Sequence, residues 1–240
     1  MKKRVWIFLL LTFVFAGIVS LMPLQVGSEE NRVLAVVQKM DGFFKTIENY
    51  SCEVEQIFYQ NGEESQRYRF KFYFKRGKKI RVDFSHPYSS LTIFYRGGDE
   101  EATVMPFRSL PALKFRFSID NPIILTPAGQ RINQTDMEYF IKFLLNNLEK
   151  VKQKGDEFYE DKDLMRFWLW GLDYIVGKDL EKYRIFLSKQ NWLPIRIERY
   201  HFEGKPLEVT IIQNYTINTG LEDKLFVPRA VCGTRRRVPL

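Results

Sequence analysis

Histidine and cysteine are scarce in this chain of 240 residues, which holds two of each. His86 and His201 stand in unlike contexts, and neither belongs to a zinc-binding or hydrolase motif. The spacing of Cys52 and Cys232 matches no metal-binding pattern. The sequence also lacks a phosphate-binding loop and a nucleophile motif. We therefore expect no cofactor, no metal site and no enzymatic activity.

Excess positive charge is nearly absent from the central part of the chain, although the formal net charge is +8. Residues 2–4 supply three of these charges and the C-terminal tail, residues 229–240, supplies four, which leaves about +1 for the rest. A nucleic-acid binder concentrates its basic residues on the folded domain, so we expect no nucleic-acid partner. The tail can contact anionic lipid headgroups, or it is a disordered end that aids solubility.

The N-terminus has the three parts of a secretory signal. Lys2, Lys3 and Arg4 precede an apolar run over residues 5–22, and small residues follow at Val26-Gly27-Ser28. We expect residues 1–28 to be a signal peptide, cleaved after Ser28, or an uncleaved anchor, because the run approaches the length that spans a bilayer. With either a signal peptide or an anchor, we expect residues 29–228 to be exported and to form one domain. No cysteine stands directly after the run, so we expect no lipoprotein anchor.

An oxidising compartment would allow Cys52 and Cys232 to pair. Such a disulfide would close a loop of nearly the whole domain. The spacing permits this pairing without implying it, because geometry and not sequence distance decides whether two thiols can bond. We therefore keep the disulfide as one possibility for these two residues.

Alternation of apolar and polar residues is clearest over residues 68–75. Tyr68, Phe70, Phe72 and Phe74 fall at every second position, which strand geometry places on one face. The Asn61-Gly62 pair just before this strand is typical of a tight hairpin. Ile80 and Val82 carry the same alternation into the next strand.

Two helices and one irregular segment interrupt the strands. Apolar residues at three- and four-residue steps predict helices over residues 31–47 and from Thr135 onward, the second ending near Gly155. Thr135 and Glu138 have the spacing of a capping box. Four prolines between residues 106 and 133 predict a long irregular segment, of the kind that is usually functional or mobile.

These elements predict an α+β fold. The expected sheet is a strongly curved antiparallel half-barrel of about eight to eleven strands, because so large a sheet curls. The two helices would cover its concave side. The space between sheet and helices is then either filled core or a ligand cavity.

Several short motifs, taken in order, resemble the LolA family of periplasmic lipoprotein carriers. They are NYSCEVEQ at residues 49–56, FKFYFKR at 70–76, IRVDF at 80–84, LPIRIERY at 193–200 and LFVP at 225–228. The resemblance implies a half-barrel of eleven strands whose helices form a lid over an apolar cavity. It also implies a monomeric periplasmic carrier of lipid or lipoprotein acyl chains, of the outer-membrane lipoprotein-sorting type.

The resemblance suggests roles for particular residues. Acyl chains would contact Phe70, Phe72, Phe74, Ile80 and Val82. The family latches its lid with an arginine in a Lys-Arg-Pro motif, which places Arg76 in the latch position. Gly77 departs from that motif and loosens the inference. The parity of Arg76 independently puts it at the end of the aromatic face, where it needs carbonyls or a carboxylate as partners.

A different class of function remains open from the residues alone. Aromatic side chains under two helices fill a core as readily as they line a cavity, and only packing density separates the two. With a filled core, the chain would be an envelope sensor or a structural module whose surface binds another protein. The sequence also leaves open a membrane surface as a partner.

Overall fold

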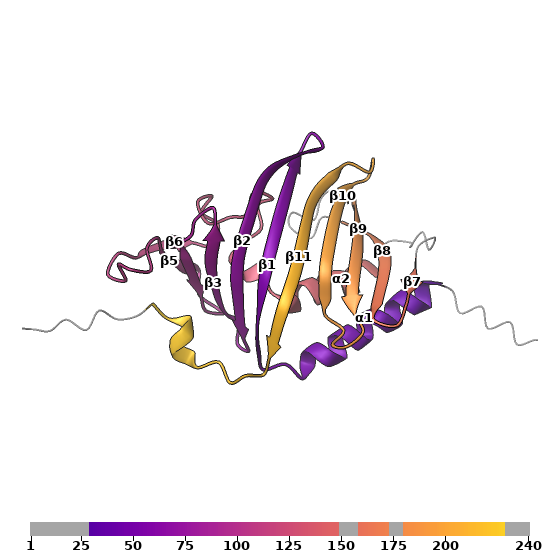
Figure 1. Cartoon of the computed structure of the whole chain (residues 1–240), viewed down its shortest axis with the longest axis horizontal. Helices are drawn as coiled ribbons and strands as arrows, with labels where there is room; N and C mark the ends of the chain where they lie inside the picture. The colour runs from indigo at the N-terminus through magenta and orange to yellow at the C-terminus, as the bar shows by residue number, and fades with distance from the viewer. Residues whose placement is uncertain (1–28, 149–157, 173–179, 229–240) are drawn as a thin grey trace, which may run out of the picture.

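The computed structural model describes residues 29–148, 158–172 and 180–228. Its main feature is a single eleven-stranded antiparallel sheet in the order β6-β5-β4-β3-β2-β1-β11-β10-β9-β8-β7 (Figure 1). The strands are β1 (Asn49–Gln60), β2 (Glu63–Lys75), β3 (Lys79–His86), β4 (Thr92–Tyr95), β5 (Glu101–Met105), β6 (Phe115–Ser118), β7 (Tyr159–Glu160), β8 (Leu164–Leu172), β9 (Leu180–Ser188), β10 (Pro194–His201) and β11 (Pro206–Ile217).

The sheet consists of two meanders that meet in its middle. Strands β1 to β6 follow one another outward in one direction, and β11 to β7 do so in the other. The seam is the pairing of β1 with β11, which runs from Tyr50 opposite Ile217 to Phe58 opposite Glu208. The first and last strands of the domain therefore lie side by side at the centre of the sheet.

The alternation in β2 separates the side chains on the concave face from those on the convex face. Register pairs Phe74 with Tyr50 and Phe72 with Cys52, so these side chains share one face. Phe72 and Phe74 are buried and Phe70 is half-buried against the same core. The hairpin turn between β1 and β2 has Asn61 and Gly62 at positive φ, as the Asn-Gly pair predicts.

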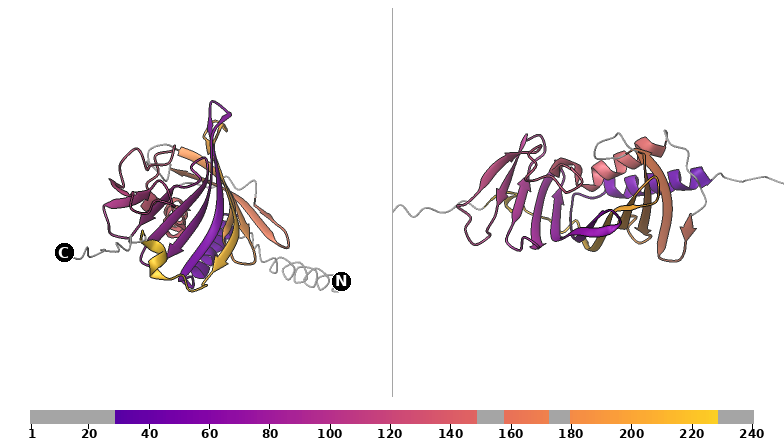
Figure 2. Two further views of the ribbon diagram at one scale, coloured as in Figure 1. Left: turned by 60° about the vertical axis from the view of Figure 1, so that its left-hand side comes forward. Right: turned by 90° about the horizontal axis from the view of Figure 1, so that it is seen from above.

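Two α-helices cover the concave side over β1 and the strands from β8 to β11. Helix α1 (Glu29–Lys45) and helix α2 (Met137–Leu148) lie beside each other against the sheet (Figure 2). Their inward residues join the strands in one continuous core; from α1 these are Val33, Val36, Val37, Met40 and Phe44, and from α2 Met137, Phe140, Ile141, Phe143, Leu144 and Leu148. The open, curved sheet with two helices confirms the predicted half-barrel.

The start of α2 corrects the sequence analysis. The helix begins at Met137 and not at Thr135, and the capping residue is Asp136, whose Oδ1 accepts the backbone N–H of Tyr139 at 3.0 Å. Thr135 instead donates its hydroxyl to the carbonyl of Ile132 at 2.7 Å, which closes the 3₁₀ turn η1 (Ile132–Gln134). An aspartate caps a helix as well as a threonine does, so the spacing of Thr135 and Glu138 alone predicted the wrong capping residue. The predicted end near Gly155 lies outside the described residues.

Smaller differences concern short edge strands. The segment predicted to be irregular contains β6, and the two-residue β7 forms the opposite edge. Both are too short for a two-residue period to be clear in the sequence.

Helix α1 ends at Lys45, two residues before the predicted end, because the backbone N–H groups of Thr46 and Ile47 donate to the carbonyls of Phe43 and Phe44. Within the described residues, no helix has the length and apolar character needed to cross a membrane.

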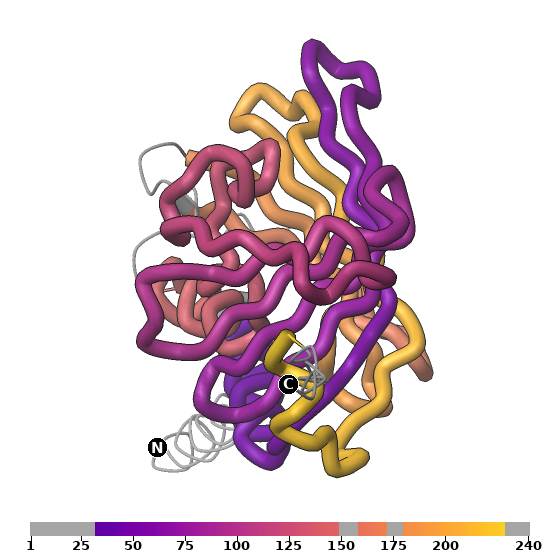
Figure 3. Tube along the Cα trace, turned by 90° about the vertical axis from the view of Figure 1, so that its left-hand side faces the viewer, coloured from indigo at the N-terminus to yellow at the C-terminus, as the bar shows by residue number. Residues whose placement is uncertain are grey.

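The end of the described chain returns to the first meander. The 3₁₀ turn η2 (Asp223–Phe226) lies beside the strands β2 and β3 (Figure 3). The carboxylate of Asp223 pairs with Lys75 and Lys79, each at 2.7 Å. Phe226 is buried there. These contacts tie the C-terminal segment to the outer side of the hairpin that carries the aromatic face.

Candidate ligand-binding cavity

A cavity of about 120 Å³ lies between the concave face and the segment from Thr126 to Phe140. Strands β1, β2, β3, β10 and β11 form its floor. The lining residues are Tyr50, Cys52, Val54, Gln56, Phe70, Phe72, Val82, Ile197, Arg199, Glu208, Thr210, Ile212 and Tyr215 from the sheet, and Thr126, Gln130, Gln134, Thr135, Asp136, Met137 and Phe140 from the segment.

One part of the cavity is apolar and aromatic. The ring of Tyr50 stacks on Phe72 and Phe74, with centroids 6.0 and 5.1 Å apart. Burial raises the pKa of Tyr50 and of Tyr215 well above the ordinary tyrosine value. The Tyr215 hydroxyl donates to the carbonyl of Pro194 at 2.9 Å. Both hydroxyls are therefore uncharged at neutral pH, and this part of the cavity suits an apolar ligand.

The five residues predicted to contact acyl chains do not all reach this space. Phe70, Phe72 and Val82 line the cavity. Phe74 and Ile80 are 1% and 0% exposed and lie in the core next to it. Contact of all five with an acyl chain stays a prediction, and Phe74 and Ile80 would need the core to open.

Cys52 also lines the cavity. It is buried on the concave face, and burial raises the pKa of its thiol far above the ordinary value. A buried thiol that holds its proton is a poor nucleophile. Cys232 lies outside the described residues, so the disulfide stays a prediction.

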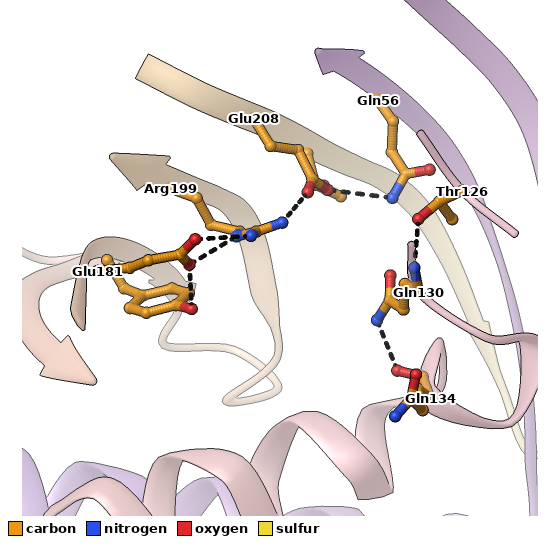
Figure 4. Close-up of polar contacts among 9 residues, drawn as sticks. Gln56, Thr126, Gln130, Gln134, Glu181, Arg199 and Glu208 are labelled. Carbon is orange, nitrogen blue, oxygen red and sulfur yellow. Dashed lines mark hydrogen bonds and ion pairs between the residues drawn. The ribbon is translucent and has the colours of Figure 1, made fainter. Parts of the chain in front are cut away.

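The other part of the cavity is polar and centres on Arg199 (Figure 4). Its guanidinium donates to Glu181 through Nη2 and Nε, at 2.9 and 3.1 Å, and to Glu208 through Nη1 at 2.6 Å. All three residues are at most 5% exposed. They come from the neighbouring strands β9, β10 and β11, whose register places Arg199 opposite Glu208.

Polar contacts extend from this triad toward the covering segment. Gln56 Nε2 and Thr210 Oγ1 both donate to Glu208 Oε1, at 3.3 and 2.9 Å. On the segment, the backbone N–H of Gln130 donates to Thr126 Oγ1 at 3.0 Å, and Gln130 Nε2 donates to the carbonyl of Gln134 at 2.7 Å (Figure 4). Both groups border the same cavity, so its polar part has hydrogen-bonding groups on two sides.

Asp136 adds a buried carboxylate to the cavity wall. While Oδ1 caps α2, Oδ2 lies 3.6 Å from Lys78 Nζ and has no hydrogen-bond partner within the described residues. Burial raises the pKa of Asp136, and the nearby charge of Lys78 offsets only part of this rise. The charged form of this carboxyl is thus less favoured in the folded protein than in water.

Asp136 should make the folded state less stable as the pH rises. A carboxyl with a raised folded-state pKa stabilises the fold below the unfolded pKa of about 3.9, and this contribution is lost as pH rises through the folded value. Asp136→Asn keeps a capping oxygen and removes the titration. In urea unfolding between pH 3.5 and 7, the stability of the native protein relative to the variant should fall with pH. A constant or rising difference would contradict this assignment.

Arg76 directly follows β2 and lies beside the C-terminal end of α1. Its Nη2 donates to the carbonyl of Phe44 at 2.6 Å, and its guanidinium carbon is 5.0 Å from the centre of the Phe44 ring. Phe44 belongs to the last turn of α1, where carbonyls lack helical partners. This contact joins a helix end to the sheet, as a latch would require. Its release to open the cavity stays a proposal.

Arg76→Gln should loosen α1. The change removes a charge-assisted hydrogen bond, and such bonds contribute about 1.5 kcal/mol or more. Hydrogen exchange should show faster exchange of the α1 amides, with smaller changes in β8 and β9. Lys71→Gln, an exposed change on the same strand, is the matched control. Equal protection of α1 in both variants would rule out a latch at Arg76.

The sequence analysis missed the polar triad, although a signal for it exists. Glu181 alternates in phase with the buried Tyr183 and Ile185 of β9, and Arg199 is in phase with Ile197, which lines the cavity. A charged residue at a position of inward parity is either partnered or functional. Parity could therefore have placed Glu181 and Arg199 inside, but the mutual contacts depend on strand register.

Comparisons of this chain with known proteins find similarity among solved structures. No protein-family model and no curated protein matches the sequence. Among solved structures, a domain from Vibrio parahaemolyticus assigned to outer membrane lipoprotein sorting is 16% identical, with a TM-score of 0.47, covering 80% of this chain and 95% of that chain. A LolA superfamily protein from Nitrosomonas europaea is 16% identical, with a TM-score of 0.39 and coverages of 81% and 96%.

A third similar structure is the lipoprotein LppX from Mycobacterium tuberculosis. It is 8% identical, with a TM-score of 0.44, covering 80% of this chain and 97% of that chain. At such identities, likeness concerns the fold alone and leaves the ligand open. The structure of this chain itself shows the open eleven-stranded antiparallel sheet with two α-helices, which is the predicted α+β half-barrel.

Proposed function

We propose that this chain is an exported, monomeric binder or carrier of lipid or lipoprotein acyl chains, of the lipoprotein-sorting type. The observation that supports this most is the cavity under the covering segment, which is largely apolar and has a few polar groups on its wall. Ligand pockets commonly combine apolar walls with a few placed polar groups. Burial of each methylene would contribute about 0.8 kcal/mol to capture.

The size of the cavity implies that binding requires opening. Pockets for drug-sized ligands are about 300–1,000 Å³, whereas this cavity is about 120 Å³. A complete acyl chain would therefore have to move the covering segment or the helices away from the sheet. The Arg76 contact with the end of α1 is one place where such a motion would begin. Opening would also expose Phe74 and Ile80 to the ligand.

Filling the cavity should abolish ligand uptake. Ile212→Phe places a larger side chain into the cavity, whereas Ile211→Phe makes the same change on the opposite face of β11. We expect uptake of a fluorescent fatty acid analogue to fall at least tenfold in the first variant and to stay unchanged in the second. Native mass spectrometry of protein purified from membranes should show co-bound lipid. If the native protein takes up no fatty acid analogue and its mass spectra show only apoprotein, the proposal is wrong.

Export and membrane contact belong to the same proposal. Residues 1–28 would direct the chain to the periplasm, either as a cleaved signal or as an anchor through residues 5–22. The basic tail, residues 229–240, would contact the membrane surface or extend into solvent. Residues 1–28 and 229–240 both lie outside the described residues.

A second candidate function is an envelope sensor or structural module that binds another protein. The small cavity favours it, because most of the concave side is packed by the two helices. In that case Ile212→Phe would leave function intact, and a stoichiometric protein partner would co-purify with the chain. The uptake measurement above therefore separates the two candidates.

A further inference from the structure

Exposed apolar side chains gather between β5 and β6, at the outer edge of the first meander (Figure 1). Eleven large apolar residues are exposed within the described part of the chain, and four of them fall within nine positions. These four are Phe107, Leu110 and Leu113 in the β5–β6 loop (residues 106–114) and Phe115 at the start of β6. Scattered exposed apolar residues are ordinary, whereas a contiguous group of them marks an interaction surface.

Two successive turns give the β5–β6 loop its shape. The backbone N–H of Leu110 donates to the carbonyl of Phe107 at 3.0 Å, and that of Leu113 donates to the carbonyl of Leu110 at 2.9 Å. Pro111 is the second residue of the latter turn, where the fixed φ of proline is favoured. The first and last Cα atoms of a turn lie within about 7 Å, so the two turns place the three exposed apolar residues next to one another.

Arg108 fastens these turns to the connection between β3 and β4. Its backbone N–H donates to the carbonyl of Ser90 at 3.2 Å, and its Nη2 donates to the carbonyls of Phe84 and Ser89. The loop is thus fixed to the sheet while its apolar side chains stay outside the core. Burial of these side chains would be favourable, and a partner that covers them would supply it.

The charge around this loop is of one sign. Residues 106–119 contain Arg108, Lys114 and Arg116 and no acidic residue. Glu101, the first acidic residue before them, pairs with Ser118 at the other end of the β5–β6 hairpin. Apolar contact alone would suit a protein partner equally well. Basic residues beside exposed apolar ones favour an anionic membrane surface, which attracts the charges and buries the apolar groups.

We propose that the β5–β6 loop docks this protein on an anionic membrane surface. Its exposed apolar side chains enter the headgroup region of the bilayer, and Lys114 and Arg116 contact lipid phosphates. Docking at this place sets the orientation of the domain, with β6 facing the lipid and β7 at the opposite edge of the sheet.

This inference goes beyond acyl-chain binding and does not depend on it, because none of the residues of the β5–β6 loop lines the cavity. It also differs from membrane contact through residues 1–28 or 229–240. The loop is part of the folded domain and joins two strands of the sheet, so its contact with lipid can be measured separately from that of either terminus.

An environment-sensitive fluorophore on the loop tests the proposal. Nitrobenzoxadiazole is attached at Leu110→Cys in the full chain carrying Cys232→Ser, and the buried Cys52 stays unlabelled. The matched control carries the label at Phe202→Cys, between β10 and β11 on the other meander; Leu110 and Phe202 are both 57% exposed. With vesicles of phosphatidylcholine and phosphatidylglycerol, we expect emission to rise at least threefold at position 110 and to change little at position 202. A chain held only by its termini would not produce this difference.

A charge variant tests the preference for anionic lipid. Lys114→Gln with Arg116→Gln, in the chain labelled at position 110, should raise the lipid concentration at half-maximal signal at least fivefold. Arg108 is left unchanged because it holds the loop. Vesicles of phosphatidylcholine alone should give a weak signal with either chain.

Three outcomes would overturn the inference. The first is a response at position 110 no larger than that at position 202, and the second is an equal response to phosphatidylcholine alone. The third is a signal that grows with protein concentration in the absence of lipid, because the loop would then bind a second copy of the chain. None of these results bears on fatty acid uptake, which tests the proposed function separately.

Discussion

Replacing Arg199 with methionine should lower the free energy of unfolding by about 3–5 kcal/mol, the usual cost of breaking a buried ion pair from one side. The change leaves Glu181 and Glu208 buried with no guanidinium between them. Methionine fills a similar volume, so the loss reports charge and hydrogen bonding more than packing. Urea unfolding should show it directly, and the melting temperature should fall by roughly 6–20 °C.

Two variants make this prediction specific to the triad. Arg199→Lys keeps the charge and loses the two-pronged contact with Glu181, so we expect a loss smaller than that of Arg199→Met. Removing all three charges, with Glu181→Gln and Glu208→Gln added to Arg199→Met, should recover much of the stability. If the triple variant is no more stable than Arg199→Met alone, unpaired carboxylates are not the cause of the loss.

Phe74→Ala should also destabilise the fold by about 3–5 kcal/mol, the range for truncation of a buried phenylalanine. The ring is 1% exposed and packs on Tyr50 and on Phe44 of α1, with a centroid 5.9 Å from that of Phe44. The substitution therefore removes contacts within the sheet and between the sheet and α1. Chemical denaturation of the variant measures the loss.

Phe70→Ala is the matched control for this change. Phe70 lies two residues earlier on the same face, but it is half-buried and borders a cavity that exists already. Its truncation should therefore cost clearly less than that of Phe74 and should enlarge the space for a ligand. Equal losses at the two positions would show that the cavity is no less tightly packed than the core.

Much of the fold can be predicted because its pattern is local. The alternation in β2 and the Asn61-Gly62 turn specify a hairpin and its buried face without reference to distant residues. The helical periodicity over residues 31–47 likewise predicts α1, and each predicted end lies two residues from the observed end. Short edge strands such as β6 carry too few residues for such a pattern.

The candidate site was only partly predictable because it depends on distant parts of the chain. Phe70, Phe72 and Val82 follow from alternation in one hairpin. The contact between Arg199 and Glu208 requires the register of β10 against β11, and the approach of Gln56 requires β1 as well. Cavity volume depends on how side chains from the sheet and the covering segment fit together, which no sequence period reports.

The seam between β1 and β11 has a consequence for biosynthesis. Partners in this seam, such as Tyr50 and Ile217, stand at opposite ends of the domain sequence, so the centre of the sheet cannot form until β11 has been made. Pairings between residues so far apart slow folding. The central pairing of the sheet therefore forms only after nearly the whole domain has been synthesised, whereas the local hairpins of the first meander can form earlier.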